Sequence, residues 1–161
     1  MINVSKIKKG IVLDHIESGR ANVLYRALKL EEVTDAVVLM QNIFSTSMGK
    51  KDLIKIETDY NLDFTVLGLI APHTTVNFIE NGERVKKIRM EMPEVVEGVL
   101  TCKNPRCITN SEREIAGHKF HLYNRDKKEY KCEYCDTVTT SGISILIFLT
   151  RSPFSIKLTV V

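Results

Sequence analysis

The stretch Thr74-Val-Asn-Phe-Ile-Glu-Asn-Gly-Glu-Arg-Val-Lys-Lys-Ile-Arg-Met90 decides the fold of the first half of the chain. Two runs that suit β-strands flank Asn81-Gly82, a dipeptide that tolerates the positive φ angles of a type I′ turn. The pattern predicts a β-hairpin with strands at 74–80 and 83–90. Antiparallel strands are therefore expected in this half of the protein.

The residues before the hairpin contain further strand-like runs. Short apolar and β-branched segments predict strands at 10–16, 35–44 and 51–57. The longest of these, 35–44, is apolar through most of its first part, which predicts burial on both faces.

Two helices are expected between those strands. After Ser18-Gly19, apolar side chains recur at helical spacing and share one face: Ala21, Leu24, Tyr25 and Leu28. Residues 59–69 are assigned to a second helix because the chain needs a crossover there. This order of elements predicts an α+β fold of the ferredoxin-like kind, an antiparallel sheet with two helices on one face.

Composition limits the class of protein. The 161 residues are 43% apolar and 27% charged, which is typical of a soluble globular protein. The net charge of +3 suits an anionic ligand but is too small to indicate bulk nucleic-acid binding. The first residues form no signal peptide, and the most apolar run, 143–149, is shorter than a membrane span. We therefore expect a soluble, cytoplasmic protein.

Four cysteines, all in the last part of the chain, form two close pairs. They are Cys102 with Cys107, and Cys132 with Cys135. Two such pairs can place four thiolates around one point, a closed tetrahedral cage that suits a structural zinc ion. The alternatives are two disulfides, which need an oxidising compartment, or four unrelated buried thiols.

Met92-Pro93-Glu94 interrupts the strand pattern and predicts a domain boundary. The first domain would span 1–92, and the second, 93–161, would be a small all-β unit. So few residues cannot bury a large apolar core, and a metal is a common substitute.

No catalytic motif is recognisable in the sequence, and the cysteines are already assigned to the metal. His118 and His121 could chelate metal, but the four-thiolate set is complete without them. Asp14-His15 closes an apolar strand and is a candidate for ligand contact. Lys55, Lys86 and Lys87 on strands could converge on a polyphosphate, or could simply form a solvated basic face.

A set of short segments spread over residues 1–136 is distinctive in combination. They are Gly10-Ile-Val-Leu-Asp14-His15-Ile, Gly49-Lys-Lys-Asp-Leu-Ile-Lys55-Ile-Glu57, Ala71-Pro72 with Thr75-Val-Asn77, Pro93-Glu94, Cys102-x2-Pro-x-Cys107-Ile-Thr and Cys132-x-Tyr-Cys135. In this order they resemble the regulatory chain family of aspartate carbamoyltransferase.

The resemblance implies a non-catalytic subunit that controls the first committed step of pyrimidine synthesis. It implies an N-terminal domain that binds CTP and ATP in one pocket, with UTP assisting in some members. The zinc domain would dock on a separate catalytic chain, and regulatory chains would pair as homodimers through their N-terminal domains.

The resemblance also assigns residues. Asp14 and Lys55 would bind the ribose and base region, and His15 and Lys87 would face the triphosphate. The remaining pocket residues would be Ile7, Val12, Asn77 and Ile79. The zinc ligands would be Cys102, Cys107, Cys132 and Cys135, shaping a loop around Asn104 that contacts the catalytic chain.

Two features depart from the family. Gly82 stands where some members carry a larger side chain near the base, and the tail 137–161 extends past the usual end. Two other functions would suit parts of the sequence. A zinc-ribbon nucleic-acid-binding protein would use Arg84, Lys86, Lys87 and Arg89, whereas a small metalloenzyme would use His118 and His121 at an open zinc site.

Overall fold

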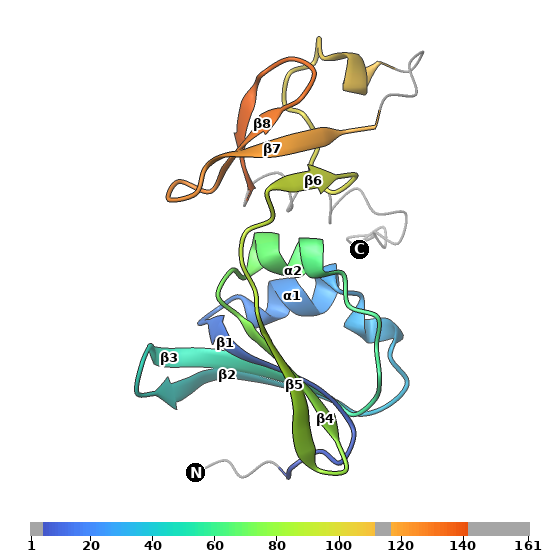
Figure 1. Ribbon diagram of the computed structural model, residues 1–161, viewed down its shortest axis with the longest axis vertical. Helices are drawn as coiled ribbons and strands as arrows, with labels where there is room; N and C mark the ends of the chain where they lie inside the picture. Colours follow the sequence, from blue (N-terminus) through green and yellow to red (C-terminus); the bar gives the residue numbers. More distant parts are fainter. Residues whose placement is uncertain (1–4, 112–116, 142–161) are drawn as a thin grey trace, which may run out of the picture. The chain divides into compact units, whose positions relative to one another are not determined.

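The computed structural model describes residues 5–111 and 117–141, and the chain divides into two compact units, Met1–Glu91 and Met92–Val161 (Figure 1). Within the described ranges, no helix combines the length and apolar composition needed to cross a membrane.

The first unit contains a five-stranded sheet in the order β2-β3-β1-β4-β5. Its strands are β1 Gly10–Glu17, β2 Val37–Ser45, β3 Gly49–Ile56, β4 Thr75–Glu80 and β5 Glu83–Arg89. Every neighbouring pair is antiparallel. The order matches the predicted ferredoxin-like arrangement, extended at one edge by β5.

The hairpin predicted around Asn81-Gly82 is confirmed, with β4 and β5 paired antiparallel. Its turn residues Asn81 and Gly82 have φ angles of 51° and 76°, the left-handed values that a type I′ turn requires. Gly82 N–H also donates to the carbonyl of Lys8 (2.8 Å), which ties the segment before β1 to the turn.

Two helices, α1 Ala21–Ala27 and α2 Phe64–Ile70, cover one face of the sheet (Figure 1). A short 3-10 helix, Leu30–Glu32, follows α1. The covered face supplies the core, whose sheet side chains are almost fully buried: Ile11, Leu13, Ile16, Ile54, Ile56 and Val76. The expected helix at 59–69 begins later, because the Asp63 carboxylate caps α2 by accepting the Val66 N–H at 3.1 Å.

Burial of the 35–44 strand on both faces was a wrong prediction. In the described structure β2 pairs with β3 and lies at the sheet edge, so its side chains are half-buried or exposed through most of its length. Phe44 is 79% exposed. The helices cover only one face of the sheet. In addition, a strand at the sheet edge has a neighbouring strand on one side only.

A β-bulge interrupts β1 between Leu13 and Ile16, which pair with Ile54 and Asp52 of β3. Three steps along β1 therefore match two steps along β3, so Leu13 and Ile16 both face the core. The extra residue lies in the Asp14-His15 dipeptide, where His15 has a φ of 58°. The bulge explains how two consecutive polar residues leave the apolar side of a central strand.

The second unit is a four-stranded antiparallel sheet in the order β6-β7-β8-β9. Its strands are β6 Val95–Glu97, β7 Lys119–Asn124, β8 Glu129–Cys132 and β9 Val138–Thr140, with a short 3-10 helix at Ile108–Asn110. Val96, Phe120 and Tyr130 are fully buried. Tyr130 donates its hydroxyl to the carbonyl of Pro93 (2.8 Å), and burial raises the Tyr130 pKa to about 12.

The small all-β fold predicted for this half is confirmed. Part of the segment that we assigned to an atypical tail, Val138–Thr140, is a regular strand of this sheet. The rest of that tail, residues 142–161, lies outside the described residues.

Candidate functional site

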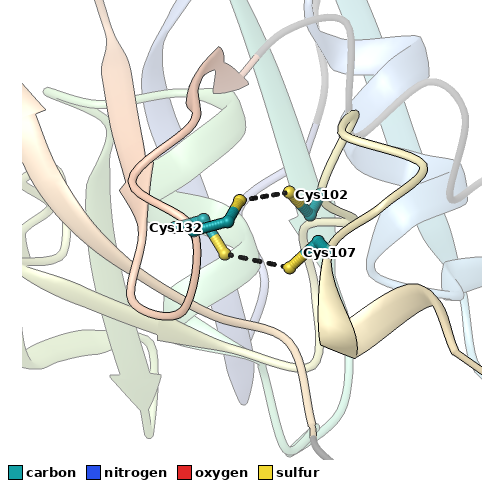
Figure 2. Close-up of side chains that lie close together, drawn as sticks. Cys102, Cys107 and Cys132 are labelled. Atoms are coloured by element: carbon teal, nitrogen blue, oxygen red, sulfur yellow. Dashed lines mark hydrogen bonds between the residues drawn. The ribbon is translucent and has the colours of Figure 1, made fainter.

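The four cysteine sulfurs of the second unit converge on one point. Their Sγ atoms all lie within 4.8 Å of one another. Cys102 Sγ lies 3.5 Å from Cys135 Sγ, and Cys107 Sγ lies 3.8 Å from Cys132 Sγ. Figure 2 shows Cys102 and Cys107 on one loop facing Cys132 on another. Four Zn–S bonds of about 2.3 Å would separate tetrahedral sulfurs by about 3.8 Å, so the donor set fits a zinc ion.

The disulfide alternative does not hold in this geometry. A disulfide requires an S–S distance of about 2.05 Å, and all four cysteines are free. Three of the four are buried, and the fourth, Cys135, is half-buried.

Asn104 shapes the loop that carries the first cysteine pair. Its side-chain oxygen accepts the Arg106 N–H (3.0 Å), and its carbonyl accepts the Cys107 N–H (3.1 Å). Asn110 closes the loop by donating its side-chain amide to the carbonyls of Cys102 (2.9 Å) and Asn104 (2.7 Å). These bonds hold the two sulfurs on the same side of the loop.

The second pair lies in the turn between β8 and β9. Cys132 N–H donates to the Thr137 carbonyl (2.9 Å), and Asp136 N–H donates to the Cys132 carbonyl (3.1 Å). Asp136 adopts a φ of 60°, which reverses the chain directly after Cys135. The turn thereby directs both sulfurs toward the first loop.

Threonine hydroxyls support two of the sulfurs. Thr109 Oγ1 lies 3.1 Å from Cys107 Sγ, and Thr137 Oγ1 lies 3.1 Å from Cys135 Sγ. Burial raises the pKa of Cys102 to about 12. Burial also acts to raise the pKa of Cys135, but hydrogen bonds, chiefly from Thr137, lower it to about 6. A bound divalent cation would replace the protons and stabilise all four thiolates.

The two histidines near the cage have other partners. His118 Nδ1 accepts the Cys102 N–H at 3.3 Å, and burial lowers the His118 pKa, which keeps this nitrogen an acceptor. His121 Nε2 lies 3.2 Å from Glu133 Oε1. The histidine-based open site considered for a metalloenzyme is therefore not assembled in this structure.

In the first unit, four of the predicted nucleotide-binding residues form a row across the sheet. Val12 of β1 pairs with Lys55 of β3 on one side and with Asn77 of β4 on the other. Asn77 in turn pairs with Lys87 of β5. Residues directly opposite one another in neighbouring strands share a face. Because Ile11 and Leu13 face the helices, this row lies on the opposite, open face.

Two apolar residues lie toward the beginning of β1. Ile79 follows Asn77 on the same face of β4 and pairs with Gly10. Ile7 precedes β1 and is buried. An open hollow of about 770 Å³ lies nearby, lined by Lys8, Lys9, Glu80, Asn81 and Gly82. Because Gly82 has no side chain, it leaves this hollow open at its side.

The β1 bulge forms a polar cluster on the other side of the row, further along β1. Asp14 Oδ1 accepts the His15 N–H (2.6 Å) and lies 2.8 Å from Lys51 Nζ. Burial acts to raise the Asp14 pKa, but Lys51 and His15 together outweigh it and lower the pKa below its ordinary value. Lys51 is a candidate site residue that the sequence-based prediction did not include. Its four-residue spacing from Lys55 on one strand, which places both on one face, was the available signal.

Three buried polar atoms of the first unit have no hydrogen-bond partner among the described residues: His15 Nδ1, Thr74 Oγ1 and Asn77 Oδ1. Buried polar groups usually have hydrogen-bond partners, and His15 and Asn77 both belong to the predicted site. Seven of the eight predicted residues lie on β1, β3, β4 and β5, and Ile7 lies shortly before β1.

Comparison with known protein families accounts for both units. Residues 2–91 match the family model for the allosteric domain of the aspartate carbamoyltransferase regulatory chain, and residues 94–144 match the model for its metal binding domain. The chain belongs to the aspartate carbamoyltransferase regulatory chain family.

Individual members of this family are similar over most of their length. A regulatory chain from Clostridium tetani is 48% identical over 139 residues, which cover 86% of this chain and 96% of that protein. One from Clostridium botulinum is 43% identical, covering 88% and 97%. One from Caldivirga maquilingensis is 43% identical, covering 85% of each.

Membership confirms that the chain is a regulatory rather than a catalytic subunit, in agreement with the missing catalytic motif. The metal-binding match covers all four clustered cysteines, which confirms the expected site for one structural metal ion, zinc in this family. The match also extends to residue 144, so the departure that we predicted after Asp136 was placed too early. The reason is β9, which follows the last cysteine and completes the sheet.

Proposed function

We propose that the aspartate carbamoyltransferase regulatory chain described here binds CTP and ATP on the open face of its first sheet. We further propose that it acts in the cytoplasm and attaches through its zinc unit to the catalytic chain. The observation that carries the proposal is the row of Lys55, Val12, Asn77 and Lys87 across four strands. This register gathers two cations and an amide around an apolar centre, which suits a phosphorylated heterocycle.

The proposed site would have one end for the base and ribose and another end for the triphosphate. Ile7, Val12 and Ile79 would form apolar walls for the base, and Asp14 with Lys55 would contact the ribose region. His15 and Lys87 would face the triphosphate. Lys51 belongs to the same end, since it already lies 2.8 Å from Asp14 and could exchange part of that contact for a phosphate.

Allosteric control requires that a nucleotide bind one quaternary state more tightly than another, because equal affinity shifts no equilibrium. CTP and ATP share ribose and triphosphate, so opposite effects would originate at the base. The open hollow beside Gly82 supports a base end that admits both ring sizes. A coupling free energy of about 1–3 kcal/mol is usual for such regulation.

Assembly would use both units. Pairing of two regulatory chains through their first units is supported by β2, which lies at the sheet edge and exposes Phe44. Docking on the catalytic chain would use the loop around Asn104, which the zinc ion and the Asn110 side chain hold in shape.

The decisive experiment is co-purification with a catalytic chain, followed by activity titration with CTP and ATP. We expect a stable complex whose activity changes with nucleotide, in opposite directions for the two effectors. A complex that forms but ignores both nucleotides would refute the effector role. Failure to form any complex would refute the docking role.

A further inference from the structure

Asp52 of β3 is a fully buried carboxylate to which the nucleotide site described above assigns no role. It lies on the helix-facing side of the sheet, one residue along from Lys51, which lies on the open side. Its carboxylate accepts three backbone N–H groups, from Gly19 (2.9 Å), Ala21 (3.2 Å) and Asn42 (2.9 Å). No ion pair of Asp52 is found among the described residues.

Each donor belongs to a segment outside the regular hydrogen-bonding pattern of the β-sheet. Gly19 lies in the turn that follows β1, and Ala21 is the first residue of α1, a few residues after the bulge that contains His15. Asn42 lies in a second bulge, in β2, where Met40 and Ile43 pair with Leu53 and Lys51. Asn42 has a φ of 57°, so its N–H points away from the ladder and needs another acceptor.

The two bulges lie on opposite sides of β3 at the same level, next to Asp52. The β1 bulge ends at Ile16, which is the residue paired with Asp52. A hydrogen bond between the Ser18 hydroxyl and Asn42 Oδ1 links the same two segments at the surface. Strands β2 and β3, the turn that follows β1 and the beginning of α1 are therefore joined through one carboxylate.

We propose that Asp52 is a positioning residue of the effector site. By fixing the chain on both sides of β3, it holds the β1 bulge in the shape that presents Asp14 and His15 beside Lys51. A non-glycine residue with positive φ in a strand carries backbone strain, and surrounding hydrogen bonds must hold it there. This inference rests on the proposed nucleotide function and adds a residue that itself touches no nucleotide.

The test uses the full-length chain with Asp52→Asn. The asparagine amide has nearly the same shape as the carboxylate, but it has only one acceptor oxygen. Its NH2 group would therefore face one of the backbone N–H groups that Asp52 now accepts. Calorimetric titration with CTP is expected to show affinity weakened about tenfold, the scale of a lost charge-assisted hydrogen bond. Affinity for cytidine, which keeps the ribose contact of Asp14 but lacks the phosphates, is expected to weaken clearly less, by about threefold.

Asp63→Asn is the matched control. Asp63 also accepts a backbone N–H at the start of a helix, but asparagine caps helices as well as aspartate does. Its affinity for CTP should equal that of the wild type. A merely destabilising effect of Asp52→Asn would weaken CTP and cytidine equally, and that result would overturn the proposal.

A second measurement needs no variant. In the wild-type chain, saturating CTP is expected to slow amide hydrogen exchange at Gly19, Ala21 and Asn42 by about tenfold. Unchanged exchange at these three amides would overturn the role of Asp52, even if the variant did not fold. A wild-type chain that binds no CTP would instead refute the proposed function and this inference together, whereas unchanged CTP affinity in Asp52→Asn refutes the inference alone.

Discussion

At the scale of single residues, the candidate site works through neighbouring side chains that play opposite structural roles. On β3, Lys51 contributes its charge to the open face while Asp52 organises the backbone on the buried face. On β5, Lys87 belongs to the proposed site, while Lys86 lies over the ring of Phe78 at 5.8 Å. Alternation along a strand therefore allows each candidate cation to be tested against its neighbour.

Replacing Lys87 with alanine should weaken nucleoside triphosphates roughly tenfold or more, because it removes a charge-assisted phosphate contact. Nucleosides should bind almost as before. Lys86→Ala is the control, since its partner Phe78 pairs with it on the other face. Calorimetry with CTP and cytidine measures both, and equal losses for the two ligands would remove Lys87 from the phosphate role.

Replacing Lys51 with methionine should raise the pKa of Asp14, because burial would then act with less opposition. In the wild type the folded-state pKa lies below the ordinary value of 3.8, so Asp14 stabilises the fold above that pH. This contribution is lost as pH falls through the lower, folded-state value. In Lys51→Met the folded-state pKa moves back toward the ordinary value, so this acid-dependent loss of stability should become smaller.

Carboxyl chemical shifts followed by NMR from pH 7 downward would report the Asp14 pKa directly. Urea unfolding over the same range would report the stability. Lys50→Met serves as the control because Lys50 is exposed and has no ion pair with Asp14 among those described. An unchanged Asp14 pKa in Lys51→Met would contradict the assignment of its cause.

At the scale of elements, backbone geometry decides where the strands place their side chains. The bulge in β1 and the bulge in β2 each add one residue opposite β3, and each contains a non-glycine residue with positive φ. The beginning of β1 is equally constrained, since Gly10 has a φ of 144° and a Cβ there would lie 1.9 Å from the Ile56 carbonyl oxygen.

Gly10→Ala should therefore destabilise the first unit by more than about 2 kcal/mol, because strain and a backbone clash act together. Gly49→Ala is the matched control. Gly49 also has positive φ, at 74°, but its Cβ would meet nothing within 4 Å, so a cost of about 1 kcal/mol is expected. Urea unfolding compares the two, and equal losses would show that the contact with Ile56 is unimportant.

Some elements were predictable from sequence and others were not. The type I′ turn at Asn81-Gly82 and the apolar face of α1 depend on neighbouring residues, and both predictions were confirmed. The edge position of β2 depends on which strands pair, and the apolar run 35–44 gave no sign of it. Bulges escaped prediction for the same reason, since a register shift is defined only relative to a partner strand.

At the scale of the whole molecule, two units divide the proposed duties. Each has its own sheet and its own buried core. The polar row belongs to the first unit and the four sulfurs to the second, so each can be disabled while the other is measured.

Cys107→Ala should abolish docking on the catalytic chain while leaving CTP binding by the first unit intact. Removing one of four thiolates opens the cage, and a small unit loses the ion that supplies much of its folding free energy. Co-purification, metal content and CTP calorimetry together test the division. A metal-free variant that still assembles with the catalytic chain would refute it.

The sequence by itself determined the metal ligands, the hairpin turn and the family, because these depend on residue types at short spacings along the chain. Only the tertiary structure decided that Lys55, Val12, Asn77 and Lys87 form one row, and that Asp52 joins two bulges. The physical reason is that pairing register is a relation between distant segments. It is set by the apolar face that must be buried, and no local pattern specifies which residues become neighbours across the strands.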